Sequence, residues 1–314
     1  MLWSKGNRMK RKLLTYLLLL AIVPLWSQNT LIPSVSNYHL TWTTINPAFT
    51  GFRDAISASS LYRSAMYGSI GPQDMQLNVH TPVGNSKVAV GGIVAYNHSP
   101  SSQNLFSVMS TYAYRLYLGS GRLSFGLSAG MYGYTSDLSG IDVRDPGDPA
   151  FPADPYQRWF PNFGTGVLYY TEQYFIGLSV PELLSIPRED QPIGTVNLEE
   201  YRVILAGAYL FDFSTAFRLK PSLMIDYNQA STVFKASLNA GFMDSRFFVG
   251  GAYSHPNFAI ALLNFQVNPQ WLVGYAYTFN VGPVHKALGG SHEIVLRWEW
   301  RPTIKTIPDD PFYF

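Results

Sequence analysis

The residues best suited to chemistry in this sequence are its histidines, an aspartate-rich stretch and one Ser-His pair. The histidines are His39, His80, His98, His255, His285 and His292. They are scattered over different segments, and none of them repeats at the short fixed offsets that paired metal ligands use. The sequence therefore predicts no metal site, and loop polarity is the simpler account of these residues.

The aspartate-rich stretch spans residues 137–154 and contains Asp142, Asp145, Asp148 and Asp154 among proline and glycine. Clustered carboxylates can bind calcium, but this stretch lacks the glutamate that closes an EF-hand loop. A solvated loop on the outer side of the protein is the favoured interpretation.

Three aromatic residues follow this stretch and are the candidates for a partner contact: Tyr156, Trp159 and Phe160. We expect them in the same outer loop, which would end at Pro161. Exposed aromatic side chains often mark protein contacts. An interface girdle and a folded lid explain them equally well.

The adjacent pair Ser291 and His292 resembles a nucleophile and its base. Neighbouring residues of a strand point to opposite sides, so these two cannot act on each other. No Gly-x-Ser-x-Gly elbow occurs in the sequence. We therefore predict a protein that is not an enzyme, with no catalytic residue and no cofactor.

The first 27 residues have the three parts of a secretory signal peptide. Five basic residues precede residue 13, an apolar run covers residues 13–26, and the small Ser27 follows. The run is too short for a membrane-spanning helix, which needs about 20 residues. Its removal would leave 17 basic against 20 acidic residues, a formal charge of −3, so nucleic-acid binding has no support. The chain has no cysteine, which excludes disulfides and a cysteine-linked lipid anchor.

The composition favours an outer-membrane β-barrel. Aromatic residues make up 15% of the chain and charged residues only 13%, about half the roughly 25% usual in soluble domains. No second long apolar run follows the signal peptide. An exported chain with this composition fits a transmembrane barrel in the outer membrane of a Gram-negative cell.

Alternating runs of about ten residues, separated by turn residues, support the same fold. They predict an all-β antiparallel barrel of about fourteen strands, near residues 54–66, 73–81, 87–97, 104–118, 122–136, 162–171, 174–180, 200–211, 216–227, 231–242, 246–254, 257–267, 270–280 and 291–301. The three longest connections, residues 137–161, 181–199 and 281–290, all follow odd-numbered strands. They therefore share one end of the barrel, which is expected to be the outer one.

We expect residues 28–52 to form an N-terminal periplasmic or plug segment, partly inside or beneath the barrel, because they show no sustained alternation. Residues 53–301 would form the barrel, and residues 302–314 a periplasmic tail. The lumenal faces carry many small residues, together with Ile93, Ile204, Met224 and Val295. A wide porin would carry more charge there, so a lumen that is narrow, plugged or suited to an apolar guest is expected.

The last predicted strand alternates clearly, with Ile294, Leu296 and Trp298 on one face and Arg297 and Glu299 on the other. If the apolar face meets lipid, an arginine at position 296 should be costly near the bilayer midplane. A change at Arg297, on the lumenal face, is expected to be milder.

Several short motifs together resemble the PorP/SprF family of type IX secretion membrane proteins of Bacteroidetes. They are Asn46-Pro47-Ala48-Phe49-Thr50-Gly51, Tyr62-Arg63, Tyr112-Ala113-Tyr114, Leu123-Ser124-Phe125-Gly126, Gly177-Leu178-Ser179 and Gly290-Ser291-His292-Glu293-Ile294. The resemblance covers residues 46–300. The chain departs from the family in having Ser64-Ala65 after Tyr-Arg, where Gln and Trp are usual, and in extending beyond the usual end.

The resemblance implies an outer-membrane barrel that works with other type IX components and serves secretion or gliding motility. It would bind the C-terminal sorting domains of secreted adhesins for export or surface retention. The family offers no transferable partner-contact motif. Two alternatives remain open: a transporter for hydrophobic small molecules, and a barrel that anchors a periplasmic assembly through its short turns.

Overall fold

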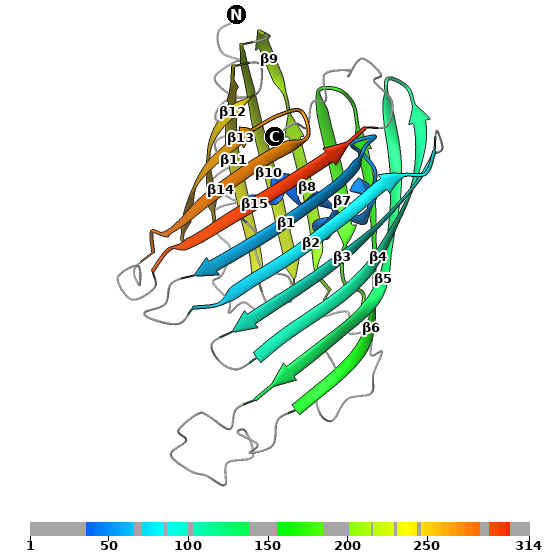
Figure 1. Ribbon diagram of the computed structural model, residues 1–314, viewed down its shortest axis with the longest axis vertical. Helices are drawn as coiled ribbons and strands as arrows, with labels where there is room; N and C mark the ends of the chain where they lie inside the picture. Colours follow the sequence, from blue (N-terminus) through cyan, green and yellow to red (C-terminus); the bar gives the residue numbers. More distant parts are fainter. Residues whose placement is uncertain are drawn as a thin grey trace, which may run out of the picture.

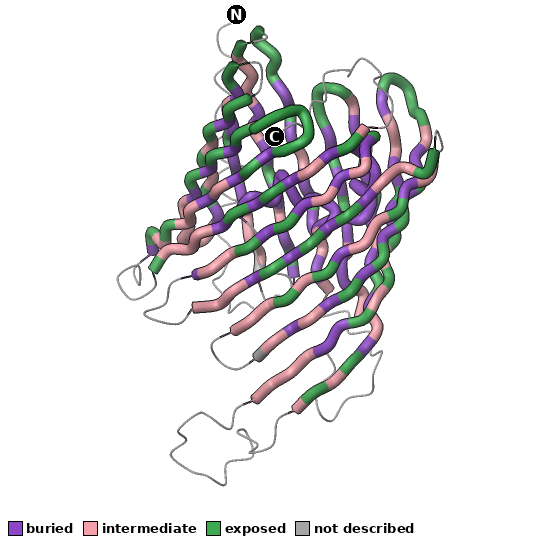
Figure 2. Tube along the Cα trace, in the orientation of Figure 1, coloured by how far each residue is buried: buried purple, intermediate pink, exposed green. Residues whose placement is uncertain are grey.

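The strands alternate inward and outward side chains along almost their whole length, and this alternation closes them into a barrel. The computed structural model describes residues 36–65, 71–84, 87–99, 103–137, 156–184, 201–214, 216–228, 231–243, 246–282 and 289–301. Figure 2 shows buried and exposed positions alternating along the strands. Outward residues are mostly large and apolar, as expected for a wall facing lipid.

The described strands are β1 (Ile56–Ala65), β2 (Gln73–Pro82), β3 (Val88–Ser99), β4 (Gln103–Leu118), β5 (Gly121–Ser136), β6 (Tyr156–Tyr170), β7 (Tyr174–Val180), β8 (Val203–Tyr209), β9 (Phe211–Ser214), β10 (Phe217–Asn228), β11 (Ser231–Phe242), β12 (Phe247–Ser254), β13 (Phe258–Gln266), β14 (Trp271–Asn280) and β15 (Ser291–Trp300). Each pairs antiparallel with its neighbours (Figure 1).

Fourteen of these strands form a closed ring, because β15 pairs with β1 and β10 pairs with both β8 and β11. The short β9 is the extra strand and pairs only with β10 among the described strands. The predicted all-β fold and strand number are confirmed. A single predicted strand at 200–211 is instead β8 and β9, which are separated at Leu210.

No helix in the described part of the chain is long and apolar enough to span a membrane.

The N-terminal plug, residues 36–53, lies inside the ring. It contains η1 (Tyr38–Leu40), α2 (Trp42–Ile45) and η2 (Pro47–Phe49), and nearly all of its residues are buried. The short blue helices in Figure 1 lie within the ring, behind the front strands of the barrel. This position confirms the expectation of an N-terminal segment within the barrel.

The lumen holds more charge than the sequence suggested. Buried charged side chains of the wall include Arg115, Lys220, Asp226, Lys235, Glu293, Arg297 and Glu299. The plug occupies the same interior. These charges therefore face the plug, and they do not indicate a water-filled pore. Arg297, treated as a tolerant lumenal position above, is buried, and its Nε lies 3.2 Å from Glu299 Oε1.

Leu296→Arg is expected to lower the unfolding free energy of the barrel by about 2–4 kcal/mol, because Leu296 lies mid-strand on the lipid side with 40% of its surface exposed. Leu296→Val should change little. Urea titration of the barrel refolded into lipid vesicles measures both changes. An arginine that is tolerated at this position would contradict the assignment of the lipid face.

Candidate functional site

The first part of the plug is held by a buried carboxylate of the wall. Glu293 on β15 accepts hydrogen bonds from the main-chain N–H groups of Ser36 and Asn37, at 2.8 Å and 2.6 Å. Asn37 Nδ2 donates to Asn264 Oδ1 on β13 at 2.8 Å. Glu293 is fully buried, and charge-assisted hydrogen bonds of this kind are the stronger ones in proteins. One carboxylate therefore anchors two successive peptide groups of the plug.

Tyr38 and His39 continue this polar contact across β10 and β11. Tyr38 Oη lies 2.9 Å from Ser222 Oγ and His39 Nε2 lies 3.0 Å from Ser237 Oγ. The ammonium group of Lys235 lies over the Tyr38 ring, 5.1 Å from its centroid. Asn239 Nδ2 also donates to His39 Nε2, at 3.2 Å, which requires a neutral imidazole that accepts through Nε2.

Burial lowers the pKa of His39 well below its ordinary 6.5, and the nearby charges of Lys220 and Lys235 lower it further. The unfolded chain therefore binds a proton on this histidine below about pH 6.5, while the folded chain does not. Its contribution to stability is complete above pH 6.5 and is lost as the pH falls from there toward the lower, folded pKa.

We expect acid to loosen the wild-type plug more than the plug of a His39→Gln variant between pH 7 and 5. Glu182, in the connection after β7, has its pKa raised to about 7 by burial. It acts in the opposite direction, because its contribution is lost as the pH rises. Glu182 is present in both proteins. The difference in protease accessibility of the plug between wild type and variant therefore reports the contribution of His39 alone. Identical pH profiles would contradict this role of His39.

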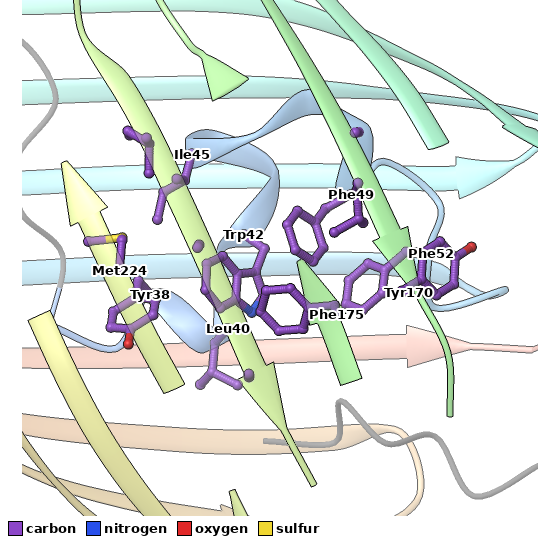
Figure 3. Packing of buried hydrophobic residues seen from close by; sticks show 14 of the residues in the cluster. Tyr38, Leu40, Trp42, Ile45, Phe49, Phe52, Tyr170, Phe175 and Met224 are labelled. Atoms are coloured by element: carbon purple, nitrogen blue, oxygen red, sulfur yellow. The ribbon is translucent and has the colours of Figure 1, made fainter. Parts of the chain in front are cut away.

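The middle of the plug packs in an aromatic cluster with β6 and β7 (Figure 3). The rings of Trp42 and Phe49 are stacked, with centroids 5.0 Å apart at 12°. Phe175 on β7 meets both rings edge-on, at 5.0 Å and 5.3 Å. Phe52 continues the cluster toward Tyr170 on β6, at 6.5 Å. Aromatic pairs in these geometries add stability beyond their buried area.

Two glycines of the wall form the hollow that receives the turn at residues 46–48. Gly126 on β5 and Gly166 on β6 face each other in the strand register. A Cβ at Gly126 would overlap the backbone N of Ala48, and one at Gly166 would overlap the side chain of Asn46. Only glycine permits this close approach of the backbone. The Asn-Pro-Ala turn therefore fits this place on the wall specifically.

Hydrogen bonds fix the same turn in the hollow. Asn46 caps η2 by accepting from Ala48 N at 2.9 Å, and its Nδ2 donates to Val167 O at 3.2 Å. Ser124 Oγ donates to Ala48 O at 2.7 Å. Ser179 Oγ donates to Ile45 O at 2.8 Å. The plug thus spans three neighbouring strands at a single turn.

Charged contacts hold the end of the plug, where the chain passes into β1. Gly51 has φ +70°, a conformation that favours glycine, and its carbonyl accepts from Arg115 Nη1 at 2.8 Å. Arg53 forms an ion pair with Glu299 on β15. Asp54 bridges Arg115 and Arg122, each at 2.6 Å. The plug is therefore tied to β15 near both of its ends and to β5, β6 and β7 at its middle.

A cavity of about 40 Å³ remains between the plug and the wall of β1 to β5. Its lining includes the apolar residues Leu61, Ile93, Leu105 and Met109 and also polar residues such as Asp74, Gln76 and Asn97. This space suits one or two water molecules and no larger guest. The described lumen is therefore plugged, as one of the three interpretations of the sequence expected.

The structure corrects the placement of Tyr156, Trp159 and Phe160. All three belong to β6 rather than to an outer loop, and they pair with Ser136, Gly133 and Tyr132 on β5, respectively. Phe160 faces the lumen and is buried against Tyr132, with ring centroids 5.7 Å apart. Trp159 faces outward and packs on Phe106 of β4 at 6.1 Å. Tyr156 packs against Tyr134 at 6.3 Å.

The predicted start of this strand, residue 162, was too late, because proline usually ends a strand and Pro161 precedes it. Here β7 reaches β6 only as far as Thr165, so no described strand pairs with this edge of β6 before that residue. Leu183 N bonds to Phe163 O on that edge, and by alternation the missing N–H of Pro161 lies on it too. The three aromatics are split between the two faces of this strand.

The other candidates from the sequence do not converge on a site. His292 meets Tyr275, with Nδ1 and Oη 2.7 Å apart. The acidic residues Asp142, Asp145, Asp148 and Asp154 and the histidine His285 lie outside the described residues. Within the described ranges, no group of three or more His, Cys, Asp and Glu residues could hold a metal ion.

The plug contacts were missed because their partners lie far away in the sequence. The Asn46-Pro47-Ala48 turn gave a partial indication of the plug, since it stands just before the alternating strands. The hollow at Gly126 and Gly166 needs the register of β5 and β6, which a single sequence leaves open.

Comparison with known proteins gives a family and a fold. The family model described as "Type IX secretion system membrane protein PorP/SprF" matches residues 27–298. The monoaromatic hydrocarbon channel CymD is 13% identical, with a TM-score of 0.52 over 85% of this chain and 94% of that one. The toluene transporter TbuX of Ralstonia pickettii is 10% identical, with a TM-score of 0.52 over 82% and 93%. No curated protein matches the sequence.

Proposed function

Because this chain belongs to the PorP/SprF family of type IX secretion system membrane proteins, we propose that its barrel docks a secreted surface protein of the adhesin type. The barrel sits in the outer membrane. In this proposal the C-terminal sorting domain of the cargo binds the barrel, which exports it or retains it at the surface. Other type IX components are the further partners, and no catalytic step takes part.

The observation that supports docking over conduction is the plugged lumen. Anchors at Glu293, at the hollow of Gly126 and Gly166, and at Glu299 hold the plug from opposite sides. A barrel filled in this way exposes its rims and outer connections rather than a channel. The long connections after β5, β7 and β14 share one end, which favours that end as the docking surface.

Transport of a hydrophobic small molecule is the second candidate. The likeness to CymD and TbuX concerns the fold alone at this identity. A cavity of roughly 150 Å³ accommodates benzene, whereas the described space beside the plug is about 40 Å³. Conduction through the lumen would therefore require the plug to move.

Deletion of the gene tests the two candidates together, with surface display of secreted adhesins and uptake of apolar substrates as the two readouts. Docking predicts that display is lost while uptake is unchanged, and that the wild-type gene restores display. Normal display in the deletion strain would contradict docking, and a loss of uptake alone would favour transport.

A further inference from the structure

One edge of the extra strand β9 pairs with no other described strand. It continues the line of β8 along β10 after the break at Leu210, whose side chain is buried against Phe248. β8 is covered on its other side by β7. No described strand covers β9 there, because β7 begins at Tyr174, next to Tyr209 of β8. Figure 1 shows β9 projecting at the end of the barrel opposite the one where β5 ends and β6 begins.

The main chain of Asp212 faces this open side. Leu210 N donates to Gln173 O at 2.6 Å, toward the β7 side. N–H and C=O groups alternate sides along a strand, so those of Asp212, two residues further on, point the same way. The register shift of the hairpin falls between the pairs Asp212–Arg218 and Ser214–Phe217, so the pairing is regular up to and including Asp212. An unpaired N–H and C=O at Asp212 can therefore pair with another extended chain.

Natural edge strands are usually protected by short length, bulges, lysine, proline or inward-pointing charge. β9 is short and has a register shift in its pairing with β10, but its sequence, Phe-Asp-Phe-Ser, contains no lysine and no proline. All four of its residues are exposed, and Phe213 has 64% of its surface exposed. The one charge, on Asp212, is paired with Arg218 inside the hairpin, Oδ1 to Nε at 3.4 Å.

An aromatic row flanks the open edge. The ring centroids of Tyr209 and Phe211 are 4.6 Å apart, those of Phe211 and Phe213 are 6.2 Å apart, and those of Phe213 and Phe217 are 5.7 Å apart. A strand added beside Asp212 would place alternate side chains against this row. The edge therefore offers main-chain pairing and apolar contacts to one extended peptide.

We propose that β9 is a docking edge for an extended segment of a periplasmic protein, which adds as a strand beside Asp212 and places apolar side chains on Phe211 and Phe213. The end that carries β9 is the end of the short connections, which is the periplasmic one in bacterial barrels. This site lies opposite the outer rim assigned to cargo and does not depend on that assignment.

The test places a photo-crosslinking amino acid at Phe213 in cells that hold the native set of periplasmic proteins. The same amino acid at Met243, an exposed residue of the next turn on this rim, is the control. One discrete adduct with another protein is expected from position 213 and none from position 243. No adduct at position 213, or an adduct with the mass of two copies of this chain, would overturn the proposal.

Two variants then separate strand addition from side-chain contact. Asp212→Pro removes the N–H on the open side without removing one that pairs with β10, and edge strands tolerate proline there. It is expected to abolish the adduct, whereas Asp212→Ala should retain it. An adduct that persists in Asp212→Pro would overturn strand addition.

Amide hydrogen exchange at residues 211–214 gives a second measurement should Asp212→Pro fail to insert. In wild-type protein these amides are expected to exchange more slowly in native membranes than after purification. Equal exchange in both preparations would overturn the proposal.

Discussion

Replacing Gly126 by valine is expected to push the plug off the barrel wall and open the lumen. The new Cβ would overlap both the Ala48 backbone N and the carbonyl carbon of Pro47. Both are main-chain atoms fixed by the contacts of Asn46 and Ser124, so neither can give way as a flexible side chain would. Valine suits a strand, so the strand itself should form.

Overpacking of this kind costs about 1–3 kcal/mol. If the plug absorbs that cost, its open state becomes roughly five- to 150-fold more populated, since 1.4 kcal/mol is a factor of ten. The chain has no cysteine, so one cysteine at Ala48 reports opening through its rate of maleimide labelling. Faster labelling by about this factor is expected, together with ion conductance in planar bilayers.

Gly92→Val is the matched control, because a Cβ there meets only Met109 O at 3.9 Å, an ordinary contact. It should leave labelling and conductance unchanged. Equal labelling of Ala48→Cys in the Gly126→Val and Gly92→Val backgrounds would show that the hollow does not hold the plug.

Replacing Glu293 by leucine is expected to release the first part of the plug while the turn at residues 46–48 stays in place. The change removes the acceptor of two buried N–H groups, on Ser36 and Asn37. It also removes the anionic neighbour of the buried Lys235. Loss of one partner from a buried charged arrangement costs about 3–5 kcal/mol.

A cysteine at Ser36 measures this release, because Ser36 is buried in the wild type. Labelling there should accelerate in Glu293→Leu, while labelling at Ala48→Cys should not. Glu293→Gln keeps one acceptor oxygen of similar shape and is expected to have an intermediate effect. Protection of Ser36→Cys in Glu293→Leu would contradict the anchoring role of this carboxylate.

The barrel could be predicted from the sequence because its signal is local. Alternation with period two, as in Trp271-Leu272-Val273-Gly274-Tyr275, requires only one strand, and turn residues mark where each strand ends. The position of the three long connections on one end followed from counting strands. Closure of the ring then needed no further information.

The site was hidden because it depends on contacts between segments that are distant in the sequence. Glu293 meets Ser36 across 257 positions, and nothing near Glu293 distinguishes it from a solvated lumenal charge. Arg297 was predicted on the lumenal face, where the structure has it, but its burial in a plugged lumen depends on the same distant contacts. Tyr156, Trp159 and Phe160 were misplaced because Pro161 hid the strand that carries them.

The central claim, that the plugged barrel docks secreted proteins, is tested most directly by purifying the tagged chain from native outer membranes in mild detergent. Docking predicts stoichiometric recovery of a secreted surface protein through its C-terminal domain, with recovery lost when that domain is deleted. Recovery of the barrel without any secreted protein, combined with uptake of hydrocarbons that depends on the barrel, would contradict it.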